Sequence, residues 1–125
     1  MKIKNGYMSD VMESLMKFQE QTGKTGYAIM RNIRILQPNL EDFEKVRLNL
    51  FKKYGTTNDD GNNYSISKES ENYDEFIKEY EELLNIEADI ELYQIDASDV
   101  KLQCADNASV KDYMIVSQLI SKVET

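Results

Sequence analysis

The sequence predicts a mainly helical α+β fold with four to five helices, a β-hairpin and a small antiparallel sheet. Apolar residues recur at alternating steps of four and three over residues 29–54, which is the spacing of one helix face. Residues 86–95 instead alternate with a period of two, which is typical of a strand. Residues 56–67 surround Asp60-Gly61, a strong hairpin-turn signal. A chain of 125 residues fits a single domain, residues 1–125.

The N-terminal segment predicts a short strand followed by a helix. Residues 2–4 alternate around Ile3, and Asn5-Gly6 is a dipeptide that favours a turn. Ser9 is a suitable N-cap for the helix. The apolar residues of this helix are Val11, Met12, Leu15, Met16 and Phe18. We expect its methionines to pack in the core and two glycines to make residues 21–26 a loop.

Residues 29–54 form the longest predicted helical stretch and carry one apolar face. The apolar members of this face are Ile29, Ile33, Leu36, Leu40, Phe43, Leu50 and Tyr54. Arg47 interrupts the face, and we expect the face to turn slightly onto the adjacent Val46. Because Pro38 lacks an amide hydrogen, the stretch is either one kinked helix or two helices that meet at residues 37–39, the second capped by Asn39. Gly55 is placed for a left-handed residue after the helix.

The second half of the chain adds two helices and a strand. Over residues 71–85 the helical face consists of Tyr73, Phe76, Ile77, Tyr80, Leu83 and Leu84. In the strand over residues 86–95 the core-facing side chains are those of Ile86, Ala88, Ile90 and Leu92, and the intervening ones point to water. Residues 100–104 fit a short strand or a helical turn. Ser109 and Asp112 form a capping-box pattern that opens a last helix, which reaches Val123.

The chain is acidic, with a formal net charge of −8, and its carboxylates crowd residues 79–82 and 87–91. Such a surface repels phosphates, so we expect no direct nucleic-acid binding. No apolar run approaches the roughly 20 residues that span a bilayer, and the N-terminal residues lack the apolar core of a signal peptide. We therefore expect a cytoplasmic protein without membrane association.

The sequence offers little for catalysis. It contains no histidine, which excludes Ser-His and Cys-His nucleophilic arrangements and the usual zinc ligand. Cys104 is the single cysteine, and we expect it to be a small buried apolar residue. Gly23-Lys24-Thr25 lacks the upstream glycine and preceding strand of a P-loop, and a calcium loop centred on Gly61 would lack its acidic end ligands. We therefore predict no enzyme, no cofactor and no catalytic, cofactor-binding or metal-binding residue.

Acidic side chains and one tyrosine remain as candidates for contact with a protein partner. These candidates are Glu79, Glu82, Glu87, Asp89, Glu91 and Tyr93. Carboxylates on the surfaces of helices and strands are usually only solvated, which is the simpler interpretation of the acidic residues. Tyr93 is expected on the wet face of its strand, where it either contacts a partner or covers the edge of the sheet.

Several features follow one another along the chain: KIKNGY at residues 2–7, a basic helix with Arg31 and Arg34, LFKKYG at residues 50–55, the Asp60-Gly61 hairpin and a last helix with Tyr113. This order resembles small uncharacterised proteins of bacteriophages and prophages of Gram-positive bacteria. The group has no established activity, so the resemblance implies no catalytic residues. It implies a protein of the bacterial host cytoplasm.

Two functional hypotheses follow. The first is a non-enzymatic phage accessory or assembly factor, which covers its long apolar face with a phage protein, a host protein or a second copy of itself. The second is an acidic host-directed inhibitor, a nucleic-acid mimic or anti-defence protein, whose residues 79–91 occupy a basic groove. High salt separates the two, because it should release a mimic from its partner and leave an apolar interface intact.

Overall fold

The computed structural model describes residues 1–57 and 64–122 and confirms a mainly helical α+β fold. Its helices are α1 (Asn5–Met16), α2 (Gly23–Tyr54), α3 (Tyr73–Asn85), the short 3-10 turn η1 (Ala97–Asp99) and α4 (Val110–Ile120). Its strands are β1 (Lys2–Lys4), β2 (Thr56–Thr57), β3 (Tyr64–Ser65), β4 (Glu87–Asp89), β5 (Ile95–Asp96) and β6 (Ser121–Lys122). The antiparallel pairs are β1 with β4 and β2 with β3, whereas β5 and β6 pair in parallel.

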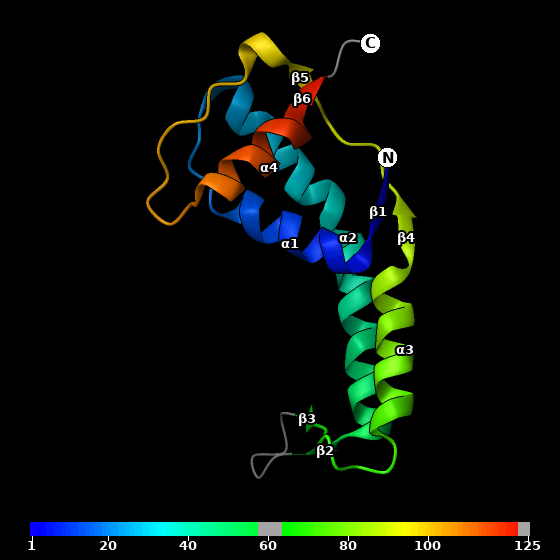
Figure 1. Ribbon diagram of the computed structural model, residues 1–125. Coiled ribbons are helices and arrows are strands. Elements are labelled where there is room, and N and C mark those ends of the chain that lie inside the picture. Colours follow the sequence, from blue (N-terminus) through cyan, green and yellow to red (C-terminus); the bar gives the residue numbers. More distant parts are fainter. Residues whose placement is uncertain (58–63, 123–125) are drawn as a thin grey trace.

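Figure 1 shows that the helices divide into two parts, which we call the body and the arm. The body contains α1, α4 and the first half of α2. The arm contains residues 41–54 of α2, which lie alongside α3 and extend away from the body. The β2–β3 hairpin lies at the far end of the arm, as expected for strands on either side of the predicted turn. The turn itself, Asp60-Gly61, falls outside the described residues.

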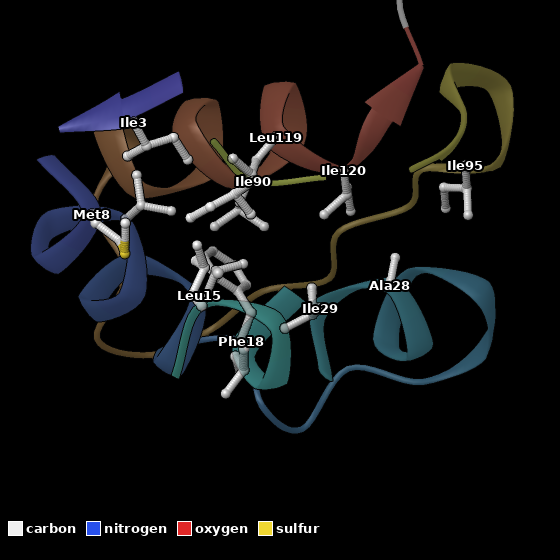
Figure 2. Close-up of a cluster of buried hydrophobic side chains, with 14 residues drawn as sticks. Ile3, Met8, Leu15, Phe18, Ala28, Ile29, Ile90, Ile95, Leu119 and Ile120 are labelled. Carbon is white, nitrogen blue, oxygen red and sulfur yellow. The ribbon is translucent and has the colours of Figure 1, made fainter. Parts of the chain in front are cut away.

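The body holds the main hydrophobic core. Side chains from α1, α2 and α4 point toward one another there, and Ile3, Ile90 and Ile95 complete the cluster from the extended segments (Figure 2). The arm has a smaller core of its own, in which Phe43 and Leu50 of α2 and Phe76 and Leu83 of α3 are buried. The apolar face of residues 29–54 therefore serves two cores in succession. Its expected turn onto Val46 is wrong, because Val46 is 50% exposed.

Helix α1 begins at Asn5, five residues before Asp10, the first helical residue that an N-cap at Ser9 would give. The expected turn at Asn5-Gly6 and the N-cap role of Ser9 are therefore wrong. The reason is a contact far along the sequence, because the backbone N–H of Asn5 donates to the Ile86 carbonyl at 3.0 Å and its side-chain amide to the Leu83 carbonyl at 3.0 Å. Asn5 thereby satisfies carbonyl groups at the C-terminal end of α3, which would otherwise lack donors.

Helix α2 begins within the expected loop, at Gly23, and runs without interruption through Pro38 to Tyr54. Gly23 has a φ of +67°, the left-handed conformation that glycine adopts without strain. Pro38 has no N–H to offer the preceding turn, and Figure 1 shows that the helix axis changes direction about midway. The structure thus has one bent helix, with Asn39 inside it and not at a cap.

Gly55 follows α2 but is not left-handed, because its φ is −93°. The position requires glycine for a different reason, which is space. A Cβ atom there would lie 2.6 Å from the carbonyl oxygen of Phe51 and 2.7 Å from that of Ser65. The close approach of the returning hairpin strand therefore excludes a side chain.

Residues 86–95 keep the predicted alternation of burial but form only a short strand, β4. Ala88, Ile90 and Leu92 face inward, whereas Ile86 is 55% exposed and does not. After β4 the side chain of Asn32 replaces a neighbouring strand. Its Oδ1 accepts from the Tyr93 N–H at 2.8 Å, and its Nδ2 donates to the Tyr93 carbonyl at 2.9 Å.

Two further polar side chains hold the next residues of this extended segment. Gln21 accepts from the backbone N–H of Gln103 at 2.8 Å and donates to its carbonyl at 3.1 Å. The Thr25 hydroxyl accepts from the Lys101 N–H at 2.9 Å and donates to the Asp99 carbonyl at 3.2 Å. Because side chains satisfy these backbone groups, residues 100–104 are neither the strand nor the helical turn expected.

The last helix begins as predicted. Ser109 and Asp112 form a complete capping box at the start of α4. The Asp112 carboxylate also accepts from the Ser14 hydroxyl at 2.7 Å and pairs with Lys17 at 2.9 Å, so it fastens α4 to α1. Among the described residues no helix has both the length and the apolar character needed to cross a membrane.

Candidate interaction site

The six residues predicted to contact a partner do not gather into one patch. Glu79 and Glu82 lie on α3 in the arm, Glu87 and Asp89 on β4, and Glu91 and Tyr93 in the segment that returns to the body. Five of the six are exposed and Glu79 is half-buried. They are thus spread along the chain from α3 through β4 to the segment before β5, whose path Figure 1 shows.

Several of these carboxylates already face positive charge within the chain. Glu79 pairs with Lys53 at 3.2 Å, and hydrogen bonds from the Tyr54 hydroxyl and from Lys53 hold the pKa of Glu79 below its usual value. Across the β1–β4 ladder, Glu87 lies opposite Lys4, and Asp89 lies opposite Lys2. These neighbours lower the net negative charge that this face presents to a partner.

Tyr93 belongs to the body and not to the arm. Its ring packs edge-to-face on Tyr27 of α2, with 5.4 Å between the ring centroids. It borders a hollow of about 490 Å³ beside the start of α2, together with Lys24, Asp99 and Lys122. Lys24 pairs with Asp99 at 3.4 Å across this hollow. The Gly23-Lys24-Thr25 segment is therefore engaged in contacts within the chain.

The arm carries an apolar groove between α2 and α3. The groove has a volume of about 350 Å³, and its lining residues are Val46, Asn49, Leu50, Lys53, Glu79, Glu82, Leu83 and Ile86. Leu50 and Leu83 are buried beneath it, whereas Val46 and Ile86 are 50% and 55% exposed. Partly exposed aliphatic side chains over a buried floor are the arrangement found at the centre of protein–protein contacts.

The two sides of this groove carry opposite charge. Between Lys45 and Tyr54, α2 has four basic residues and no carboxylate. Helix α3 has five carboxylates and one lysine, a net charge of −4. Of these charged residues, Lys53 of α2 and Glu79 and Glu82 of α3 line the groove itself. The groove therefore has an apolar floor, an α2 wall that is basic at Lys53 and an acidic α3 wall.

Of the groove residues, Val46 and Ile86 were missed as contact residues, because the sequence assigned both to buried faces. Val46, Leu50 and Lys53 are spaced by steps of four and three, so they form a second helix face beside the one that includes Phe43. That spacing was visible in the sequence. Ile86 had no such signal, because its exposure depends on where α3 ends and β4 begins.

Within the described part of the chain, no three side chains of the metal-binding types come together to hold a metal ion. Cys104, expected to be buried, is exposed in a loop. Comparison of the chain with known protein families, with curated proteins and with solved structures finds no match.

Proposed function

We propose that the chain is a non-enzymatic assembly factor that associates with a second copy of itself through the groove of the arm. The observation that carries this proposal is the exposure of Val46 and Ile86 over the buried Leu50 and Leu83. An arm of two helices leaves this groove open to water, and a second arm would complete a four-helix bundle. Its placement in the bacterial cytoplasm as a phage or prophage accessory protein rests on the sequence resemblance alone.

The charges of the groove favour a second copy as the occupant. An interface between identical chains is self-complementary when each surface carries both signs of charge. With a two-fold axis parallel to the arms, the basic wall of α2 on one protomer faces the acidic wall of α3 on its partner. In that arrangement Lys53 of one protomer lies at the height of Glu79 and Glu82 of the other. The opposite arrangement would place α2 against α2 and repel.

The alternative function, an acidic inhibitor that mimics nucleic acid, has less support from the geometry. A mimic requires several carboxylates on one face without nearby cations. Here Glu79 pairs with Lys53, and the acidic residues of β4 face lysines of β1. The six acidic and tyrosine candidates also spread over both arm and body.

A charge-exchange experiment tests the proposed self-association. Sedimentation velocity would measure the oligomeric state of the wild type, of Lys53→Glu, of Glu82→Lys and of an equimolar mixture of the two variants. We expect the wild type to dimerise and each variant to raise the dissociation constant of the dimer about tenfold or more. The mixture of the two variants should restore dimerisation, as a heterodimer. Lys111→Glu, the same charge change on an exposed residue of α4, is the control and should leave the dimer intact.

The outcomes are distinct. The dimer should persist in several hundred millimolar salt, because Val46 and Ile86 contribute apolar contact that salt does not screen, and Val46→Glu should abolish it. A wild-type chain that stays monomeric at the highest concentration reached would overturn the proposal. A dimer that the arm variants leave unchanged would show that another surface associates, which also contradicts it.

A further inference from the structure

A second apolar groove lies where α1 crosses α2. It has a volume of about 480 Å³, within the range of binding sites for compact ligands. Its lining residues are Met12, Met16, Ile33 and Leu40 along the floor, and Gln19, Gln37, Glu41 and Glu44 around the rim. None of these residues lines the groove of the arm. The two surfaces are therefore separate.

The methionines of α1 show that this groove is open. Met8 is fully buried, whereas Met12 is only partly buried and Met16 is 44% exposed. The expectation that all methionines of this helix pack in the core is thus wrong for Met16. Methionine is flexible and polarizable, so exposed methionines suit a surface that accepts apolar side chains of varied shape.

The rim of the groove is acidic. An adjoining hollow shares Met16 and Gln19 with it and is lined by Glu13, Glu20 and Asp106 as well. The cation in this lining is Lys17, and its ammonium group is bound to Asp112 at 2.9 Å. At the other end, Glu44 pairs with Arg47 at 3.0 Å. The other lining carboxylates, those of Glu13, Glu20, Glu41 and Asp106, face the solvent.

We propose that this groove binds the apolar face of a basic amphipathic helix from a protein partner. An apolar floor with an acidic rim matches a helix that has leucine-like side chains at helical spacing on one face and lysine or arginine on the flanks. The partner differs from the second copy proposed for the arm, because the residues that line this groove include carboxylates but no lysine or arginine. The chain would then join copies of itself to another protein.

The probe is a fluorescein-labelled peptide of leucine and lysine, about 16 residues long, with leucine at helical spacing. A peptide of the same composition in scrambled order, which has no apolar face, is its control. Fluorescence anisotropy would measure the affinity of both for the full-length wild type. We expect the ordered peptide to bind at least about tenfold more tightly than the scrambled one.

Two variants with the same change of charge locate the binding site. Met16→Glu adds a negative charge to the groove, so general charge attraction alone would strengthen the binding of the basic peptide. A glutamate in the apolar floor should instead lower the affinity for the ordered peptide about tenfold or more. Met114→Glu changes a methionine on α4 that is 57% exposed and outside the groove, and it should leave the affinity unchanged. Equal affinities of the two variants would overturn the proposal, as would equal binding of the two peptides.

A measurement on the wild type guards against an unfolded variant. NMR spectra of methionine methyl groups labelled with ¹³C should show shifts of Met12 and Met16 when the ordered peptide is added, and none at Met114. Shifts at Met114 alone would contradict the proposal. Sedimentation of Met16→Glu should show the same oligomeric state as the wild type. The proposed peptide site and the proposed dimer interface of the arm can therefore be refuted independently.

Discussion

Asp112 connects the first and last helices of the body. Its carboxylate accepts from the Ser109 backbone N–H at 2.9 Å, from the Ser14 hydroxyl at 2.7 Å and from Lys17 at 2.9 Å. These hydrogen bonds, that of the Ser109 N–H foremost, hold the pKa of Asp112 well below its usual value of 3.8. The carboxylate of Asp112 is therefore a source of stability that depends on pH.

The sign of this dependence follows from the lowered pKa. In the unfolded chain Asp112 gains a proton near pH 4, whereas in the folded chain it stays ionised to lower pH. Its contribution is complete above the unfolded pKa and is lost as the pH falls toward the folded one. We predict that Asp112→Asn lowers the urea midpoint at pH 7 and shows a smaller further decrease between pH 7 and about pH 3 than the wild type.

The control for this prediction is Asp106→Asn, which changes an exposed carboxylate in the loop before α4. It should leave the stability and its pH dependence close to those of the wild type. If Asp112→Asn and Asp106→Asn lost equal stability on acidification, Asp112 would not be the group responsible. The Ser109 and Asp112 pattern was readable from sequence, but Ser14 and Lys17 were not, because they come from a helix nearly 100 residues away.

Helix α2 is the element that links the two cores, and Phe43 lies in its arm half with 5% of its surface exposed. We predict that Phe43→Ala destabilises the chain by roughly 3–5 kcal/mol, the usual cost of removing a buried phenylalanine side chain. Chemical denaturation monitored by circular dichroism would measure this loss. Unchanged denaturation would show that the arm has no core at this position.

Leu48→Ala is a matched change on the same helix. Leu48 is 45% exposed, so its truncation should cost no more than about 0.5 kcal/mol. A loss for Leu48→Ala as large as that for Phe43→Ala would mean that the outer face of the arm is covered by another surface. In that case the cost should depend on protein concentration.

Much of α2 could be predicted, because its apolar spacing and its basic last turn are local signals. Its first turn could not, since Gly23 to Gly26 look like a loop. Thr25 and Gly26 are buried there, and the Thr25 hydroxyl bonds to the backbone of residues 99 and 101. The short length of β4 could not be predicted either, because the residues that follow it are held by side chains such as that of Asn32 and not by a neighbouring strand. Local sequence does not show which distant backbone a polar side chain will meet.

At the scale of the whole molecule, the two cores differ in size. The body cluster joins side chains from three helices and several extended segments, whereas the arm is held by two helices with aromatic contacts such as Phe51 against Phe76, 5.0 Å apart. Fewer buried apolar contacts mean a lower free energy of local opening. The arm should therefore open more readily than the body.

Hydrogen exchange would measure this difference. We predict that amides of α3 and of residues 43–54 exchange faster than those of residues 28–36 in dilute solution, because the arm opens without unfolding the body. If the arms pair, the exchange of these amides should slow as the protein concentration rises, while residues 28–36 stay unchanged. Uniform exchange across α2 would show that body and arm open together.

The pairing of β1 with β4 has a consequence for how the chain folds as it is synthesised. Lys2 pairs with Asp89, so β1 cannot form its ladder until β4 has been synthesised, after most of the chain. The core residues of α1, such as Met8 and Leu15, lack some of their core neighbours for longer still, because α4 supplies Val116 and Ile120. The arm, whose helices follow one another, can close earlier. A chain leaving the ribosome can pack α1 against α2, but the part of the apolar face of α1 that contacts α4 stays exposed until α4 emerges. This makes α1 a segment that a chaperone would meet.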